Sequence, residues 1–267
     1  MLTSEQIKIE AQRLHEAEQS RQQIEATTIQ YPDMVIDDAY KIQSAWMEIK
    51  KAKGRKVAGY KIGLTSRAMQ KAMNINEPDY GTLLDDMVFE EGTEIDSSQF
   101  LDPRIEVELA FILKDKLFGE NISVIDVLNA TDYVVPALEL IAARTHRVHP
   151  DTGYKRTVRD TISDNAANAG IIMGGLPVRA DAIDLRWIGA MMSRNGVIEE
   201  SGVSGAVLNH PAKGVAWLAK KYARHGIALE PGQIILAGSF TRPVSIRAGD
   251  TFTVDYGELG TISCYFK

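Results

Sequence analysis

The chain has one cysteine, no long apolar run and no long uninterrupted run of basic residues. The lone Cys264 excludes an internal disulfide and any zinc cluster built from cysteines. No stretch approaches the roughly 20 apolar residues of a membrane span. A formal net charge of −6 without a basic run argues against a nucleic-acid partner, which is normally bound by clustered Lys and Arg. These absences favour a small-molecule partner.

Several catalytic motifs are absent as well. No G-x-S-x-G occurs, which argues against a serine nucleophile. GIIMGGLP is rich in glycine but lacks the Lys-Ser/Thr ending of a phosphate-binding loop, and no G-x-G-x-x-G is present, so nucleotide binding has little support. The first residues are polar and charged, unlike a secretory signal, and we therefore expect a cytoplasmic protein.

The N-terminal part of the chain has the pattern of amphipathic helices. A capping box from Thr3 to Gln6 predicts a first helix that ends before Tyr31. A second helix is predicted to begin after a cap at Asp37 and to stop at Gly54. We therefore predict a small helical domain over residues 1–56.

Short β-like runs separated by Gly, Pro and Asp follow this segment. They are VAGYKIGL, RIEVELAFIL, VVPALELI, GIIMG, DLRWIGAMMS, QIILAG, DTFTVDY and TISCYF. Asn195-Gly196 is a strong type I′ hairpin signal, which favours antiparallel or mixed pairing. One helix, opening at Pro211 and closing at Gly226, interrupts the series. The fold class predicted is α+β, with a β-rich catalytic domain over residues 57–267.

Two carboxylates share one face of a single predicted strand. In RIEVELAF, Glu106 and Glu108 are two positions apart, so both side chains point the same way. Two neighbouring carboxylates cannot both remain ionised when they are buried away from solvent unless a cation compensates their charge. The pair is therefore either part of a face open to water or a set of ligands for a hard divalent cation such as Mg²⁺.

Two further charged residues lie inside apolar runs. Glu139 in VVPALELI is expensive to bury unless it is paired or bound to a metal, so it is a candidate third ligand. Lys61 in YKIGLTS either extends to the surface or lies partly buried near the carboxylates, where it could bind an anion or exchange a proton.

Two polar segments are less decisive. EPDYGTLLDDM offers Asp79 in a loop punctuated by Pro and Gly, where acidic residues usually form turns. DTISDNAANAG contains Ser163, Asp164 and Asn165, and is predicted to be a helix cap followed by a turn.

These segments together resemble a known family. GYKIGLTS, EPDYGTLLDDM, RIEVELAF, NATDYVVPALEL, DTISDNAANAGIIMGG, ILAGSFTRPV and GDTFTVDYGELGTISCYF are similar to the hydratase/decarboxylase branch of the fumarylacetoacetate hydrolase superfamily. The resemblance runs from the N-terminal helices to the last strand. It implies a mixed β-sandwich roll preceded by the helical domain. One position departs from the pattern, because Ala142 stands where relatives often have an acidic residue.

The resemblance also implies a set of site residues. Mg²⁺ or Mn²⁺ would be held by Glu106, Glu108 and Glu139. The implied catalytic residues are Lys61 and Asp79. The residues implied to bind substrate are Ser163, Asp164, Asn165, Ser239 and Thr241. Arg104, Arg144 and Arg242 are candidates for binding a second carboxylate of the substrate, and the sequence does not choose among them.

The activity that the resemblance implies is addition of water to a 2-hydroxy-2,4-dienoate, giving a 4-hydroxy-2-oxo acid. Such a lyase would serve aromatic catabolism, with the homoprotocatechuate pathway as the best match, and would form a homo-oligomer. The main alternative is decarboxylation of a 2-oxo acid of the 4-oxalocrotonate type, and another is a non-catalytic partner subunit.

Overall fold

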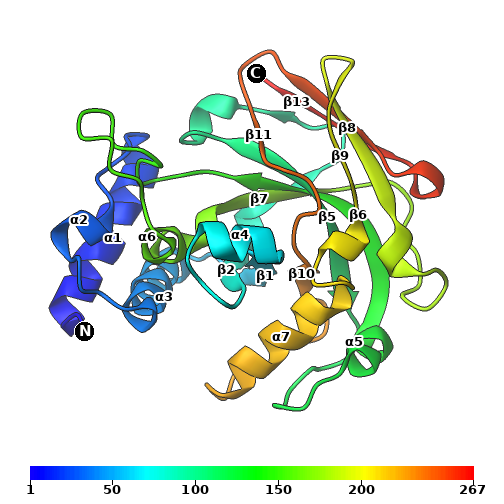
Figure 1. Cartoon of the computed structure of the whole chain (residues 1–267), viewed down its shortest axis with the longest axis horizontal. Helices are drawn as coiled ribbons and strands as arrows, with labels where there is room; N and C mark the ends of the chain where they lie inside the picture. The colour runs from blue at the N-terminus through cyan, green and yellow to red at the C-terminus, as the bar shows by residue number, and fades with distance from the viewer.

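The computed structural model describes residues 1–267 and contains two β-sheets with helices at the periphery (Figure 1). The larger sheet has eight strands: β1 (Val57–Gly63), β2 (Asp79–Leu84), β3 (Val88–Glu90), β5 (Arg104–Leu113), β6 (Thr131–Ile141), β7 (Asn168–Met173), β10 (Ile234–Leu236) and β11 (Val244–Ser245). The smaller sheet has five: β4 (Glu94–Ile95), β8 (Gly189–Arg194), β9 (Val197–Val203), β12 (Thr251–Asp255) and β13 (Thr261–Phe266). The α-helices are α1 (Ser4–Ser20), α2 (Thr27–Gln30), α3 (Ile36–Ala52), α4 (Arg67–Ala72), α5 (Val124–Ala130), α6 (Val158–Ser163) and α7 (Ala212–Ala223).

The strand pairing is mixed, as predicted. The order of the larger sheet is β2-β1-β10-β5-β6-β7-β3, with β11 also paired to β5. The β1–β10 and β3–β7 pairs are parallel, whereas the long central pair β5–β6 is antiparallel. The order of the smaller sheet is β4-β13-β12-β8-β9. The α+β class and the sandwich-like arrangement are therefore confirmed.

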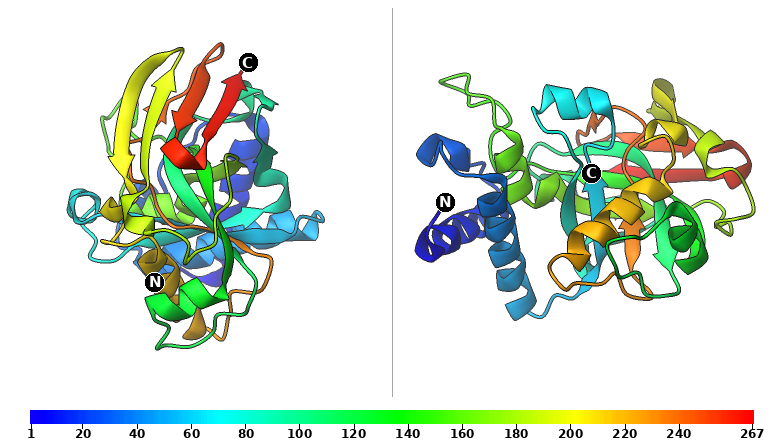
Figure 2. Two further views of the ribbon diagram at one scale, coloured as in Figure 1. Left: turned by 90° about the vertical axis from the view of Figure 1, so that its right-hand side faces the viewer. Right: turned by 60° about the horizontal axis from the view of Figure 1, so that its bottom comes forward.

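Two apolar cores hold these layers together. The larger core lies between the sheets and joins Leu109 and Leu138 of the larger sheet to Phe252 and Ile262 of the smaller one. The second core lies on the other face of the larger sheet, against α1 and α3, and includes the fully buried Trp46. Figure 2 shows α1 and α3 gathered at one end of the molecule. The helices therefore cover one face of the sheet that carries the predicted site.

The first two predicted helices are present with different limits. The capping box of Thr3 and Gln6 is formed, but α1 ends at Ser20, where Arg21 takes a left-handed φ of 58°. The helix therefore ends before Tyr31, as predicted, and a separate short helix, α2, occupies the residues directly before Tyr31. The proposed cap Asp37 lies inside the first turn of α3, and the carboxylate of Asp38 accepts a hydrogen bond from the Val35 N–H instead.

The segment EPDYGTLLDDM, predicted as a loop, contains strand β2. All six residues of this strand are buried. The segment forms a strand because it pairs with β1 along its length, and this pairing outweighs its turn-forming composition. Local propensity does not predict such long-range pairing. Asp79 is consequently the first residue of a buried strand rather than a turn former.

The hairpin and the late helix are confirmed. Asn195 and Gly196 both have positive φ, 53° and 81°, as a type I′ turn requires between β8 and β9. Helix α7 begins directly after Pro211 and is followed by Gly226 in a left-handed conformation. None of the helices combines the length and the apolar character needed to cross a membrane.

Candidate metal centre

The three predicted metal ligands lie together on the central strands. Glu106 and Glu108 lie on β5, and Glu139 is the direct cross-strand partner of Glu106 on β6. One oxygen from each carboxylate lies within 4.8 Å of the others. Glu108 and Glu139 are buried and Glu106 is partly exposed. The alternation of β5 and its register with β6 therefore bring the three side chains to one point.

Most of these carboxylate oxygens have no hydrogen-bond partner. Glu108 Oε2 accepts from the Gly238 N–H at 2.9 Å, but Glu108 Oε1 and both oxygens of Glu139 are buried without a hydrogen bond. Unpaired buried oxygens are costly, and an oxygen donor set of this kind suits a hard divalent cation. The residues therefore fit a divalent metal ion.

The metal-free cluster favours protons. Burial, followed by repulsion from Glu139, raises the pKa of Glu106 to about 7 and that of Glu108 well above its usual value. Burial also raises the pKa of Glu139. A cation or protons must therefore compensate this cluster at neutral pH.

Lys61 is buried beside the same cluster. Its Nζ lies 3.1 Å from Glu139 Oε1 as an ion pair without hydrogen-bond geometry, and donates to the carbonyl oxygen of Ala166 at 3.1 Å. Burial alone would lower the pKa of Lys61, but attraction from the four carboxylates nearby, Glu139 first, gives a net rise. The ammonium is thus charged when the cluster holds no metal.

Asp79 lies against Lys61 because glycine occupies the facing position. Gly63 is the cross-strand partner of Asp79, and a Cβ at Gly63 would lie 2.2 Å from Asp79 Oδ1 and 3.2 Å from Lys61 Nζ. Asp79 is buried, its Oδ1 has no hydrogen-bond partner, and burial raises its pKa to about 6. The two predicted catalytic residues, Lys61 and Asp79, are therefore buried neighbours.

The loop after α6 is held by its own side chains. Asp164 forms ion pairs with Arg144 and Arg156, and Asn165 exchanges two hydrogen bonds with the backbone of Thr82. Ser163 donates to the carbonyl oxygen of Arg159. These contacts fix residues 165–167, which all have positive φ and present the carbonyl oxygen that Lys61 binds.

The Ser239 to Thr241 turn is held against β5 in the same way. Ser239 Oγ donates to the carbonyl oxygens of Val107 and Thr241, and Thr241 Oγ1 accepts from the Val107 N–H. The turn therefore lies directly next to the ligand strand.

The three arginines named from the sequence differ in their surroundings. Arg144 is buried and fully engaged by Asp164 and by the carbonyl oxygen of Asn168. Arg242 is 84% exposed and pairs with Glu200. Arg104 lies next to the carboxylate cluster on β5. Arg147, which was not identified from the sequence, forms an ion pair with the same carboxylate as Arg104, that of Asp102. Arg147 lies in the segment RTHRVHP, which has neither helical nor strand periodicity, so only the fold places it here.

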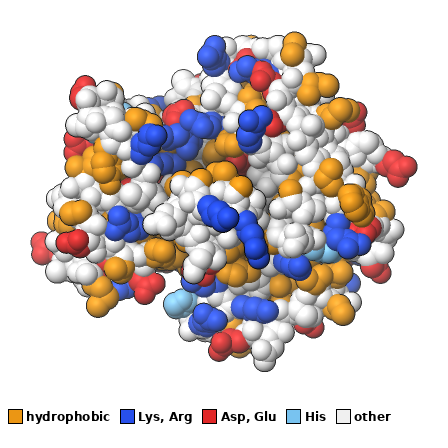
Figure 3. All heavy atoms as spheres, in the orientation of Figure 1, with side chains coloured by type: hydrophobic (Ala, Val, Ile, Leu, Met, Phe, Trp, Pro, Cys, Tyr) orange, Lys and Arg blue, Asp and Glu red, His pale blue; other side chains and the backbone are white.

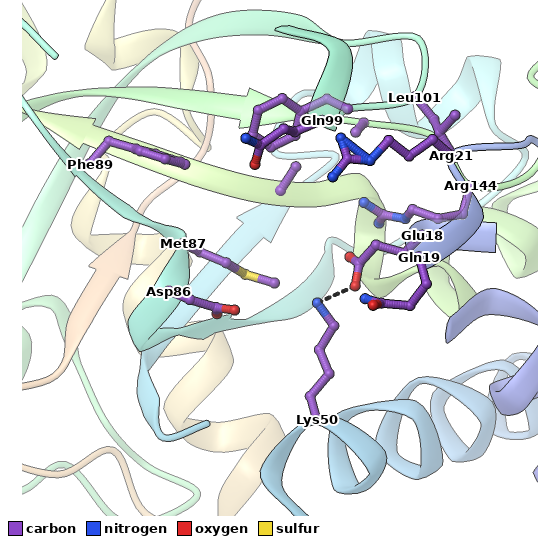
Figure 4. A pocket seen from close by; sticks show the side chains of 13 residues that line it. Glu18, Gln19, Arg21, Lys50, Asp86, Met87, Phe89, Gln99, Leu101 and Arg144 are labelled. Carbon is purple, nitrogen blue, oxygen red and sulfur yellow. Dashed lines mark ion pairs between the residues drawn. The ribbon is translucent and has the colours of Figure 1, made fainter. Parts of the chain in front are cut away.

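A separate cavity of about 230 Å³ lies between the ends of α1 and α3 and the edge of the larger sheet (Figure 4). Lys50 faces Glu18 across it at 2.6 Å, and Arg21 and Arg144 lie on another side. Ala142, the position that departs from the family pattern, also lines this cavity. No metal ligand, and neither Lys61 nor Asp79, does so.

Basic side chains gather on part of the molecular surface despite the negative net charge. Figure 3 shows Lys and Arg side chains most densely above the middle of one face. A local excess of Lys and Arg side chains attracts small anions.

The fold and this centre define the class of protein: the chain belongs to the fumarylacetoacetate (FAA) hydrolase family, whose C-terminal domain it matches over residues 57–266. Among known proteins it is 60% identical over 256 residues to 2-oxo-hept-4-ene-1,7-dioate hydratase of Escherichia coli, covering 96% of each chain. It is 36% identical over 262 residues to 2-hydroxyhexa-2,4-dienoate hydratase of Comamonas testosteroni, covering 97% of each.

A solved relative has almost the same fold. The chain superimposes with a TM-score of 0.94 on 4-oxalocrotonate decarboxylase of Pseudomonas putida G7, at 35% identity and covering 100% of this chain and 99% of that one. That protein was solved with magnesium and adipate. The family resemblance and the fold drawn from the sequence are therefore confirmed.

Proposed function

We propose that the chain is a divalent-metal-dependent hydratase that adds water to a 2-hydroxy-2,4-dienoate, with 2-oxo-hept-4-ene-1,7-dioate as the substrate. The observation that carries this proposal is the unpartnered carboxylate triad beside Lys61 and Asp79. The 60% identity to the Escherichia coli hydratase across 96% of both chains supports the particular substrate.

The cofactor we propose is Mg²⁺, with Mn²⁺ as a substitute, held by Glu106, Glu108 and Glu139. Bound there, such a cation would supply Lewis acidity, which lowers the cost of negative charge developing on the oxygens of the substrate. The related decarboxylase solved with magnesium supports this choice.

Lys61 and Asp79 would move the protons. The dienol gives up its 2-hydroxyl proton and receives one at C5, which yields an α,β-unsaturated ketone. The oxygen of water then bonds to C4 and a proton goes to C3, so that the product has gained one water. We assign delivery at C5 to the Lys61 ammonium and uptake of the released proton to Asp79, whose raised pKa suits a general base near neutral pH.

The raised pKa of Lys61 does not oppose this assignment. The attraction that raises it comes from carboxylates, Glu139 above all. This attraction weakens when the negative charge of the cluster is neutralised, and burial, which lowers the pKa of an ammonium, then counts for more.

The residues of the two loops would position this machinery. Ser163, Asp164 and Asn165 fix the turn whose Ala166 carbonyl oxygen binds Lys61. Ser239 and Thr241 fix the turn beside β5, whose Gly238 N–H binds Glu108. Substrate would meet the backbone of these turns, because their side chains are already engaged.

We further propose that the protein is a cytoplasmic homo-oligomer of the homoprotocatechuate pathway. The hydratase relatives, which share nearly the whole chain, support a role in aromatic catabolism. The division into a helical domain over residues 1–56 and a catalytic domain over residues 57–267 is also a proposal, supported by the family match that begins at residue 57.

A decarboxylase is the second candidate, because 4-oxalocrotonate decarboxylases are 36% identical to this chain over 99% of its length. The test is the ultraviolet decay of 2-hydroxyhepta-2,4-dienedioate with Mg²⁺ and with EDTA, with products identified by mass. A metal-dependent gain of one water supports the hydratase. Loss of CO₂ would replace it with the decarboxylase, and no turnover would favour a non-catalytic partner subunit.

A further inference from the structure

A pair of arginines shares one carboxylate at the edge of the metal centre. Arg147 Nε donates to Asp102 Oδ2 at 2.6 Å, and Arg104 Nη2 lies 3.7 Å from the same oxygen. Asp102 is itself held in a left-handed turn, with φ of 46°. Two guanidinium groups thus face a single carboxylate, which leaves one positive charge without a partner.

The two guanidinium groups have unused donors. Arg104 Nε is buried and has no hydrogen-bond partner, and Arg147 donates through Nε and Nη2 to Asp102 but not through Nη1. Burial, followed by repulsion from Arg156 and Arg104, lowers the pKa of Arg147 to about 10. Positive charge is therefore crowded here, and an anion would relieve it.

This charge lies next to the metal ligands. Arg147 pairs with the same carboxylate, that of Asp102, as Arg104, which is on the ligand strand β5. Arg104 and Glu106 are two positions apart on β5, so their side chains share a face about 7 Å apart. A seven-carbon dicarboxylate spans roughly 7–8 Å between its end carbons, from six bonds of about 1.5 Å each in a zigzag.

The other cations near the site are held by contacts within the fold. Arg144 and Arg156 are both bound to Asp164, and Lys61 is paired with Glu139. Of the arginines near the site, Arg104 is the one with a buried nitrogen, Nε, that has no hydrogen-bond partner, and Arg147 lies beside it at 20% exposure.

We propose that Arg147, with Arg104, binds the distal carboxylate of a dicarboxylate substrate and so sets the preference for dienedioates over dienoates with one carboxylate. This proposal rests on the proposed function, because it places the first carboxylate of the substrate at the metal centre. Asp102 orients both guanidinium groups, and its negative charge offsets the repulsion between them.

Ligand binding tests the proposal without relying on turnover. Calorimetry with the Mg²⁺-loaded protein should show tighter binding of heptanedioate than of heptanoate. Arg147→Met should weaken heptanedioate binding at least about tenfold and leave heptanoate binding unchanged, since a charge-assisted hydrogen bond is lost only for the former. The matched control is Arg242→Met, which removes an exposed arginine and should change neither affinity.

Several outcomes would overturn the proposal. Equal binding of the two acids to the wild-type protein, binding of neither, or equal weakening of both by Arg147→Met would each do so. Arg147→Lys decides the matter if the methionine variant does not fold, because lysine keeps the charge but not the planar fork and should weaken only heptanedioate binding severalfold. Selective binding of heptanedioate without any hydration would support the arginine pair and reject the hydratase.

Discussion

Glu106 and Glu139 face each other across the antiparallel pair β5–β6 as direct register partners. Like charges in this position repel and destabilise a sheet. With Glu108 they form a cluster in which three buried oxygens have no hydrogen bond. The sheet therefore tolerates a local cost that a bound cation removes.

Glu106→Gln should abolish metal binding and leave the fold intact. Removing one charge from a crowded carboxylate cluster relieves repulsion, so we expect the metal-free variant to be at least as stable as the metal-free wild type. Affinity for Mg²⁺ or Mn²⁺ should fall at least about 100-fold, as expected when a ligand itself is lost. Calorimetry and thermal unfolding measure the two effects. Unfolding of the variant together with unchanged metal affinity would contradict the site.

Lys61→Met should block the reaction without removing the metal site. Loss of a general acid typically lowers the rate by about 10²–10⁴-fold. Methionine preserves the apolar stem of the buried side chain and removes only the ammonium. The measurement is the rate of ketonisation and of hydration, with metal affinity as the control. Wild-type rates for both steps would reject the assignment.

Stabilisation by Mg²⁺ should depend on pH. In the metal-free protein the pKa of Asp79 is raised from 3.8 to about 6 and that of Glu106 from 4.5 to about 7, chiefly by burial. Between about pH 4 and pH 7 the folded state therefore holds protons that the unfolded state has released, and the free energy of unfolding falls as pH rises. Mg²⁺ must displace these protons, so its affinity falls as pH falls.

Thermal unfolding at pH 5.5 and pH 7.5, with EDTA and with Mg²⁺, measures this linkage. The rise in Tm caused by Mg²⁺ should be larger at pH 7.5. Glu106→Gln should remove most of the difference between the two pH values, since it removes both a ligand and a raised pKa. An equal rise at both pH values would show that the carboxylates do not bind protons in the metal-free state.

The sequence predicted the metal ligands better than their surroundings. Alternation along RIEVELAF places Glu106 and Glu108 on one face, and the apolar run around Glu139 marks it as a residue that needs a partner. The register that brings Glu139 opposite Glu106 is a long-range pairing that no local pattern encodes. The assignment of Glu139 to the same metal site as Glu106 and Glu108 therefore came from the resemblance to a family.

Other features depended on contacts distant in sequence. Asp79 looked like a turn residue because its strand is defined by pairing with β1. Arg147 was not identified from the sequence, because its partner, Asp102, lies 45 residues away along the chain. Residues 165–167 adopt the left-handed backbone conformation although they are Asn and Ala rather than glycine, so their composition did not predict it.

Asp164→Asn tests whether the loop after α6 acts by positioning. Asp164 is fully buried between Arg144 and Arg156, and removing one partner of such a network typically costs about 3–5 kcal/mol. We therefore expect a clear fall in Tm and a lower kcat, with KM nearly unchanged. Guanidinium chloride unfolding and steady-state kinetics measure these effects. A variant of wild-type stability with a raised KM would instead indicate direct contact with substrate.

Gly63→Ala should disturb the catalytic pair through a single methyl group. A Cβ at Gly63 would lie 2.2 Å from Asp79 Oδ1, so the carboxylate has to move away from its place beside Lys61. Overpacking of this kind costs about 1–3 kcal/mol, which the fold should survive, whereas the hydration rate should drop at least about tenfold. The control is Gly189→Ala in β8, where the new Cβ would lie 3.9 Å from its nearest contact, the carbonyl oxygen of Gly202. Loss of activity in both variants, or in neither, would show that the approach of Asp79 to β1 does not set the reaction rate.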